Sequence, residues 1–330
     1  MKRPKAPNNR TMDLSAQEQE RYGERLLQLS GPASLEMIAN RTINQDVFSV
    51  LDWLPPGCVD LLILDPPYNL TKRFGDQMFT RRSTSSYADW LEAWLPDLLE
   101  TVKPSGSVYI CGDWRSSSAI HLVVEKYLRV RNRITWEREK GRGAAGNWKS
   151  CAEDIWFCTV SDDYYFNADA VKLRRRVRAP YRDALGEAKD WETAEDGKFR
   201  LTSPSNLWTD LTVPFWSMPE NTDHPTQKPE KLIAKLILAS SRPSDVVFDP
   251  FLGSGTTSVV AAKLGRTYVG VELDPVYCAI AEKRLANAEQ NRAIQGYTDG
   301  VFWDRNSSPS SRFGEALRSV DWPPLVPRPL

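Results

Sequence analysis

The stretch VVFDPFLGSGTTSVVAAKLGRTYVGVEL, residues 246–273, has the pattern of a strand, a glycine-rich turn, a helix and a second strand. This order is the layout of a nucleotide-binding βαβ unit, in which an acidic residue, here Glu272, ends the second strand. Gly253 and Gly255 in the turn would let the backbone approach a ligand closely. A glycine turn that only joins a strand to a helix is the alternative interpretation of this stretch taken alone.

The turn differs from two common nucleotide-binding motifs. The dinucleotide fingerprint GxGxxG needs a third glycine where this chain has Ser258, and no GK[ST] sequence follows as in a Walker P-loop. The stretch therefore predicts a nucleotide-like ligand but neither of these two sites.

The alternation of short apolar runs with helix-period segments extends from Ala33 to about residue 137 and resumes after Pro225. Strands and helices at this spacing predict an α/β fold, with a mostly parallel, twisted sheet and helices on both faces. Between the two parts, residues 138–149 (REKGRGAAGNWK) predict a flexible loop, and a strand is expected at DIWFCTV. Residues 161–222 lack the alternation and predict an irregular insert.

Both ends of the chain, and its composition, add limits. Residues 1–32 predict a polar N-terminal arm with one helix-like segment, and residues 291–330, rich in Ser and Pro, predict a surface extension. With 43 basic and 43 acidic residues, attraction to a polyanion would come from local patches. Five cysteines without a CxxC pair, and apolar runs well short of the ~20 residues of a membrane span, favour a cytoplasmic protein with reduced thiols.

A second unusual stretch is ILDPPYNL, residues 63–70, at the end of an apolar run. The predicted strand stops at Asp65, and Pro66 and Pro67 stand before the aromatic ring of Tyr68. Two prolines fix their φ angles and lack backbone donors, so this segment is stiff. We expect it to hold a ligand.

Together, DPPY at 65–68 and DPFLGSGTT at 249–257 resemble the paired motifs of the S-adenosylmethionine-dependent amino methyltransferases that act on DNA. In that family the glycine motif binds the cofactor and DPPY holds the target amino group. DPPY comes first in the β class, in which the target-recognition region lies between the motifs, as residues 161–222 would here. HPTQKP at 224–229 and Asp46 match as well, and the resemblance covers roughly residues 40–290.

The resemblance implies a Rossmann-like methyltransferase fold, with a circularly permuted catalytic domain formed by residues 33–160 and 223–290. It also implies S-adenosyl-L-methionine as cofactor, bound near residues of both motifs, of HPTQKP and of the strand ends: Asp46, Asp65, His224, Thr226, Lys228, Asp249, Phe251, Gly253, Gly255, Thr256 and Glu272. Glu272 would bind the ribose hydroxyls, and Asp46 the adenine or ribose end.

Two details of the cofactor site depend on HPTQKP. Pro229 is well placed as the first residue of a helix, whose exposed N–H groups favour an anion. Thr226 and Lys228 would then help to hold the methionine carboxylate.

For His224, a loop histidine satisfied by the backbone is an equal alternative, and His121, in an amphipathic helix, is expected to be structural. Two histidines and no cysteine pair predict no metal site.

For catalysis, the resemblance makes the clamp from Asp65 to Tyr68 the binding place of a flipped-out base. The Asp65 carboxylate and the Pro66 carbonyl would each accept a hydrogen bond from the amino group, held rigidly by Pro66 and Pro67, so that its lone pair points at the methyl carbon. Tyr68 would stack on the base, which cannot be reached inside a duplex.

Three basic segments are candidates for contacts with duplex DNA, and for residues 171–182 a solvated surface run is the alternative. From residues 171–182 we expect contacts by Lys172, Arg174, Arg175, Arg176 and Arg178. From residues 71–82 we expect contacts by Lys72, Arg73, Arg81 and Arg82, and from residues 138–149 by Arg138 and Trp148.

The leading function is methylation of adenine N6 in DNA, because Asp at position 65 favours adenine over cytosine N4 in this family. The alternatives are a cytosine-N4 enzyme, a DNA-binding protein on a degenerate methyltransferase fold, and an RNA or protein methyltransferase. Within the class, the chain looks most similar to adenine enzymes of type II restriction–modification systems, which implies a partner endonuclease, GAATTC as the recognition site and a homodimer. The bacterial cytosol would be its location.

Overall fold

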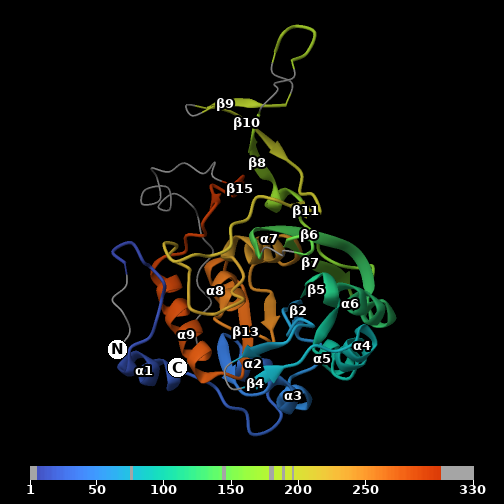
Figure 1. Ribbon diagram of the computed structural model, residues 1–330, viewed down its shortest axis with the longest axis vertical. Helices are drawn as coiled ribbons and strands as arrows, with labels where there is room; N and C mark the ends of the chain where they lie inside the picture. The colour runs from blue at the N-terminus through green and yellow to red at the C-terminus, as the bar shows by residue number, and fades with distance from the viewer. Residues whose placement is uncertain are drawn as a thin grey trace.

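The computed structural model describes residues 6–74, 77–142, 146–177, 182–187, 190–194 and 197–305. Its centre is an eight-stranded sheet (Figure 1). The strand order is β1 (Arg41–Asn44), β13 (Thr267–Glu272), β12 (Val246–Asp249), β2 (Val59–Leu64), β5 (Val102–Gly112), β7 (Ser150–Thr159), β6 (Arg129–Arg142) and β11 (Leu207–Trp208). Neighbouring strands are parallel, except that β7 runs antiparallel to β5 and β6. The predicted α/β fold with a mostly parallel sheet is confirmed.

Helices cover both faces of this sheet. One face carries α2 (Leu35–Ile38), α3 (Val47–Val50), α4 (Thr84–Glu92), α5 (Leu95–Leu99) and α6 (Trp114–Tyr127); the other carries α7 (Glu230–Ser240), α8 (Thr256–Lys263) and α9 (Pro275–Gln290). Alternate residues of β2 enter the two cores: Leu62 and Leu64 pack on the α2–α6 side, and Leu61 and Ile63 on the α7–α9 side. Burial of each such side chain contributes roughly 1.5–3 kcal/mol to the free energy of folding.

Acidic residues after the parallel strands also start the next helices. Asp46, Asp113 and Asp274 accept backbone N–H bonds from the first turns of α3, α6 and α9. An N-cap of this kind stabilises a helix by about 1 kcal/mol. The same residues therefore end strands at one edge of the sheet and fix the helix N-termini there.

The insert between β7 and α7 is not irregular throughout. It carries the short 3-10 helix η2 (Asp169–Val171) and three strands of a second sheet, whose order is β14 (Tyr297–Thr298), β15 (Val301–Trp303), β8 (Leu173–Arg176), β10 (Gly197–Thr202) and β9 (Glu192–Ala194). Phe302 and Leu173 are buried in the same apolar core as α7 and α8, so this end of the second sheet packs on the main body. Strands β8, β9 and β10 project from the main body beyond α7 (Figure 1).

The ends of the chain are more structured than their composition predicts. Strands β14 and β15 come from the predicted C-terminal extension, and residues beyond 305 lie outside the described part. In the N-terminal arm, α1 (Ala16–Gly23) begins with a capping box at Ser15 and packs on α9, where Glu18 pairs with Lys283 at 2.6 Å. The pairing of distant segments supplies the order that local composition lacks.

The glycine-rich segment was also predicted wrongly in part. Strand β6 continues through Arg138 to Arg142, because it pairs antiparallel with β7 as far as Ser150. The DPPY segment is followed by a separate two-stranded hairpin, β3 (Lys72–Phe74) and β4 (Gln77–Phe79). The 3-10 helix η1 (Leu51–Trp53) follows α3.

The five cysteines are all free thiols. Cys111, Cys158 and Cys278 are buried, Cys58 is half-buried and Cys151 is exposed. Across the described ranges, every helix is too short or too polar to span a membrane.

Candidate active site and DNA interface

The carboxyl ends of the parallel strands gather the predicted catalytic and cofactor residues at one edge of the sheet. Asp46 follows β1, Glu272 ends β13, Asp249 ends β12 and Asp65 follows β2. Strands β12 and β2 are neighbours, and the chain leaves them toward opposite sides of the sheet. In open α/β sheets, ligands bind at such a switch point.

The DPPY segment is held in place by side chains from α4 and α6. The hydroxyl of Tyr87 donates to the carbonyl of Pro67 at 3.0 Å, and the N–H of Asn69 donates to Ser116 Oγ at 2.9 Å. The Asn69 side chain exchanges two hydrogen bonds with the backbone of Arg82, at 2.7 and 3.0 Å. The stiffness expected from two prolines is thus reinforced by tertiary contacts, and Asn69 and Tyr87 are residues that the sequence analysis missed.

Asp65 uses one carboxylate oxygen within the protein. Its Oδ2 accepts a hydrogen bond of 2.6 Å from Lys228 Nζ. Its Oδ1 is buried and has no hydrogen-bond partner among the residues that the structure describes. Burial opposes the charge on Lys228, but the carboxylates of Asp65 and Glu153 outweigh it and raise the pKa of Lys228 above its ordinary value.

Tyr68 stands against a buried carboxylate that the sequence analysis also missed. Its hydroxyl donates to Glu153 Oε2 at 3.0 Å, and Lys228 Nζ lies 5.2 Å from its ring centroid. Burial, followed by the nearby charges of Asp65 and Glu153, raises the pKa of Tyr68 well above 10, so the hydroxyl stays a neutral donor. Glu153 faces the same side of β7 as Ile155, so strand alternation was the signal that could have found it.

Arg138 belongs to the buried cluster of Asp65, Lys228 and Glu153 and not to a free basic loop. Its guanidinium donates to Glu153 Oε1 at 2.6 Å. The prediction that Arg138 contacts DNA rested on a flexible loop, whereas strand β6 carries it to the side of Glu153.

The glycine turn is shaped by the two acids expected near the cofactor. Glu272 accepts the N–H groups of Gly253 and Asp274, each at 2.8 Å. The Asp249 carboxylate accepts hydrogen bonds from the hydroxyl of Thr257 at 2.5 Å and from the N–H of Phe251 at 3.0 Å. Burial raises the pKa of Asp249 to about 7, and it also raises the pKa of Glu272.

Both glycines of the turn are required by its geometry. Gly253 and Gly255 have φ angles of 55° and 84°, which side-chain-bearing residues rarely adopt. A Cβ on Gly255 would lie 2.5 Å from the Cβ of Ala281 in α9, and one on Gly253 would lie 2.9 Å from His224 Nε2. Thr256, the first residue of α8, is buried behind the turn.

An aromatic group borders the turn on its other side. The ring of Phe251 packs edge-on against Phe48 at 6.2 Å and Trp94 at 5.5 Å between centroids. Phe48 is partly exposed just after Asp46, which caps α3. Acids for ribose hydroxyls, an aromatic surface for a purine and a close backbone turn fit the chemistry of S-adenosylmethionine.

The HPTQKP segment departs from its prediction at the helix N-terminus. Pro229 is the N-cap of α7, not its first residue, and the N–H of Glu230 donates to the Glu220 carboxylate at 2.7 Å. This protein carboxylate takes the position that we expected for the cofactor's anion. The ammonium group of Lys228 pairs with the carboxylate of Asp65. Thr226 is half-buried in the loop that precedes Lys228.

The two histidines have packing contacts. His224 packs edge-on against Tyr277 with 4.5 Å between centroids, and His121 stacks on Trp156 at 4.6 Å. Within the described part of the chain, no group of three or more His, Cys, Asp or Glu side chains is arranged to hold a metal ion.

The basic residues predicted for DNA lie mainly on the second sheet. Arg174 lies over the rings of Phe199 and Trp303, at 5.0 and 4.7 Å from their centroids, and Arg176 lies over Phe199. Lys172 pairs with Asp169 at 2.8 Å. Arg178 lies outside the described residues.

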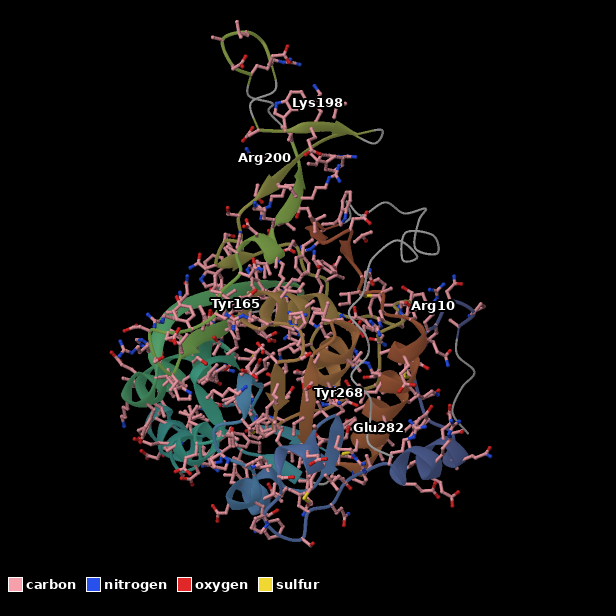
Figure 2. The ribbon with its side chains drawn as sticks, turned by 180° about the vertical axis from the view of Figure 1, so that it is seen from behind. Arg10, Tyr165, Lys198, Arg200, Tyr268 and Glu282 are labelled. Carbon is pink, nitrogen blue, oxygen red and sulfur yellow. The ribbon has the colours of Figure 1, made fainter. Side chains whose placement is uncertain are left out.

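The same sheet adds two basic residues that the sequence analysis missed. Arg175 on β8 stands directly opposite Arg200 on β10, and Lys198 lies two residues from Arg200 on the same face. Both new residues lie on the projecting strand (Figure 2). Arg200 also pairs with Asp190 at 3.5 Å, which offsets part of the repulsion between the two arginines.

The other candidates surround the DPPY segment. Arg81 is exposed, and Arg82 lies over the rings of Phe79 and Trp90, so part of its role is packing. Trp148 is 92% exposed. The side chains of Lys72 and Arg73 lie outside the described residues.

Three features define a methyltransferase of the amino-group class. They are a mostly parallel sheet with one reversed strand, a glycine turn after β12, and an acid–proline–proline–tyrosine clamp after the neighbouring β2. The model of the DNA methylase family N6_N4_Mtase matches residues 59–283. The chain belongs to this family and is a DNA methyltransferase, as the motifs predicted.

Two relatives illustrate the similarity in sequence. DNA adenine methyltransferase YhdJ of Escherichia coli K12 is 32% identical over 255 residues, which cover 75% of this chain and 83% of YhdJ. Type II methyltransferase M.HpaI of Haemophilus parainfluenzae is 31% identical over 248 residues, which cover 74% of each chain.

Two solved structures share the fold. The PvuII DNA methyltransferase, which is cytosine-N4-specific, aligns with a TM-score of 0.53 at 17% identity and covers 76% of this chain and 92% of its own. TTHA0409 of Thermus thermophilus, a putative DNA modification methylase complexed with S-adenosyl-L-methionine, aligns with a TM-score of 0.51 at 21% identity and covers 82% and 99%.

Proposed function

We propose that this DNA methyltransferase transfers a methyl group from S-adenosylmethionine to the N6 amino group of an adenine flipped out of duplex DNA. The observation that carries the proposal is the Asp65 carboxylate at the end of β2, with one buried oxygen still open to a donor. A buried acceptor without a partner costs about 1–3 kcal/mol, which a substrate N–H would recover. The relatives YhdJ and M.HpaI support the choice of class, and the name of YhdJ supports adenine.

The residues of the clamp prepare the amino nitrogen for attack. Asp65 Oδ1 and the carbonyl of Pro66 accept its two N–H bonds, so the lone pair turns away from the ring. Tyr87 and Asn69 hold the clamp, which keeps both acceptors fixed before the base arrives. Stacking on Tyr68 returns roughly 1–3 kcal/mol of the few kcal/mol that base flipping costs.

The cofactor residues work at the neighbouring strand end. When bound, S-adenosylmethionine supplies an electrophilic methyl group. Glu272 holds the glycine turn through Gly253 and binds ribose hydroxyls with its remaining lone pairs, while Phe251 and Phe48 give an apolar surface for the adenine ring. Asp46 lies beside that surface at the start of α3.

DNA contacts fall on the second sheet and around the clamp. Residues 161–222 act as the target-recognition region between the catalytic segments 33–160 and 223–290, with residues 1–32 as an N-terminal arm and residues 291–330 as a C-terminal extension. The basic face of β8 and β10 contacts phosphates. Trp114, 59% exposed at the start of α6, is a further stacking surface for DNA.

The decisive experiment identifies the product. Unmethylated duplex DNA is incubated with the protein and S-adenosylmethionine, digested to nucleosides and separated by mass spectrometry. We expect N6-methyladenine; N4-methylcytosine would replace the adenine assignment by the cytosine one. Asp65→Ala should lower kcat by about 100- to 1000-fold.

The biological setting follows from the same class. We propose a cytoplasmic enzyme that protects DNA from a partner restriction endonuclease, with GAATTC as the first recognition sequence to test and a homodimer as the assembly. Challenge of methylated DNA with several endonucleases measures the protected site, and light scattering measures the mass in solution. Cleavage by the GAATTC endonuclease after full methylation would exclude that sequence.

A further inference from the structure

Two buried side chains from opposite parts of the chain meet at the base clamp. Lys228, in the segment before α7, and Glu153, on β7, are 8% and 7% exposed. Lys228 Nζ lies 2.6 Å from Asp65 Oδ2 and 3.6 Å from Glu153 Oε2. The same Glu153 oxygen accepts the hydroxyl of Tyr68 at 3.0 Å. Lys228 therefore contacts the acid of the clamp, and Glu153 contacts its aromatic residue.

The charges of this cluster balance. Asp65 and Glu153 are two carboxylates, and Lys228 and Arg138 are two cations, each within 2.6 Å of one of them. A buried charge is costly unless it is paired and hydrogen-bonded, and removing one partner of a buried pair leaves the other charge uncompensated. The four groups therefore hold one another in fixed positions through short contacts.

The two oxygens of Asp65 are unequal because of this pairing. Lys228 occupies Oδ2, while Oδ1 is buried and accepts nothing from the described residues. A carboxylate fixed through one oxygen cannot rotate freely, so the other oxygen keeps one position. Glu153 acts in the same way on Tyr68, whose hydroxyl it anchors.

We propose that Lys228 and Glu153 are a positioning pair for methyl transfer, in which Lys228 holds Asp65 so that Oδ1 receives the target amine, and Glu153 holds both Lys228 and Tyr68. The proposal deepens the proposed function and rests on it. It assigns Lys228 to the base side of the site, in place of the contact with the methionine carboxylate that the sequence suggested.

The test compares Lys228→Met, Lys228→Arg and Glu153→Gln in the full chain, with unmethylated genomic DNA as substrate. Lys228→Met should lower kcat about 100-fold, as loss of a preorganised group does, and leave the KM for DNA and the Kd for S-adenosylmethionine within about threefold. Lys228→Arg restores the charge and should recover kcat to within about tenfold of the wild type. Glu153→Gln keeps an acceptor for Tyr68 but loses the charge, so we expect about a tenfold loss.

Lys263→Met is the matched control, because Lys263 has a similarly buried ion pair, to Glu230, away from the clamp. It should lower the thermal unfolding temperature without changing kcat. If Lys228→Met unfolds, the comparison of Glu153→Gln with the control still tests the pair.

Different results separate this proposal from the proposed function. A wild-type protein that leaves DNA unmethylated overturns the proposed function itself. An active wild type whose Lys228→Met variant keeps kcat within about threefold overturns the positioning pair. A Lys228→Met variant that loses cofactor binding, measured by calorimetry, also overturns it and returns Lys228 to the cofactor.

Discussion

The hydroxyl of Tyr87 in α4 donates a 3.0 Å hydrogen bond to the carbonyl oxygen of Pro67. This bond joins the clamp to a fully buried side chain of the core. Proline cannot donate backbone hydrogen bonds, so the clamp depends on donors of this kind for its position.

Tyr87→Phe should therefore slow catalysis more than it destabilises the fold. We expect a loss of about tenfold in kcat and about 1 kcal/mol in the free energy of unfolding, the typical net worth of one hydrogen bond. Tyr109→Phe is the control, because Tyr109 is equally buried and bonds Ser240 at 2.8 Å on the other side of the sheet. Steady-state kinetics and thermal unfolding measure both, and equal kcat losses would contradict the role of the Pro67 bond.

Substitution of a glycine in the turn tests how closely α9 packs on it. Gly255→Ala adds a Cβ 2.5 Å from Ala281 and keeps a φ of 84°, so we expect a loss of about 2–5 kcal/mol in unfolding free energy and weaker cofactor binding. Gly57→Ala, with a φ of 58° and open space around it, isolates the backbone strain and should cost about 1 kcal/mol. Chemical denaturation measures the difference; similar losses would mean that contact with Ala281 matters little.

Asp249 should make stability depend on pH in the opposite direction to a salt-bridged acid. Burial raises its pKa to about 7, so between about pH 4 and pH 7 the folded protein keeps a proton that the unfolded chain has released. Its contribution to stability is therefore lost as pH rises through this window, by up to about 4 kcal/mol. Asp249→Asn does not titrate, so the stability of the wild type relative to this variant should fall from pH 5 to pH 8. A difference in unfolding free energy that is constant with pH would contradict the assignment.

The projecting strand should contribute to DNA affinity through charge. Removal of Lys198 and Arg200 together should weaken binding at all sequences and reduce the slope of log Kd against log salt by about 2, roughly one for each phosphate contact. Arg21 in α1, at the far end of the molecule in Figure 1, is the control for loss of an exposed positive charge. Fluorescence anisotropy at several salt concentrations measures the slopes, and an unchanged slope in the double variant would remove this strand from the interface.

Sequence and structure agree best where local rules act. The run Val59–Leu64 is apolar apart from Asp60, as expected of a strand buried on both faces, and the strand from Val246 ends at an acid before a glycine turn. These patterns need only neighbouring residues to be correct. They located the sheet, the clamp and the turn.

Agreement is weaker where distant segments pair. Arg138 was predicted in a flexible loop because glycines follow it, but antiparallel pairing with β7 extends β6 through it. Phe302 lies in a Ser- and Pro-rich end, yet its strand pairs with β8 and its side chain is buried in the α7–α9 core, which orders that part of the chain. Pairing energy from partners far along the chain overrides local composition.

The sequence by itself determined the class of fold, the family and the two motifs, because strand ends, prolines and glycines act through their own backbone. Only the tertiary structure decided that Lys228 holds Asp65 and that Glu153 holds Tyr68. Asp65 and Lys228 are 163 positions apart, and Tyr68 and Glu153 are 85 apart. Ion pairs and hydrogen bonds depend on a few ångströms of separation, and the sheet sets that separation only after the chain has folded.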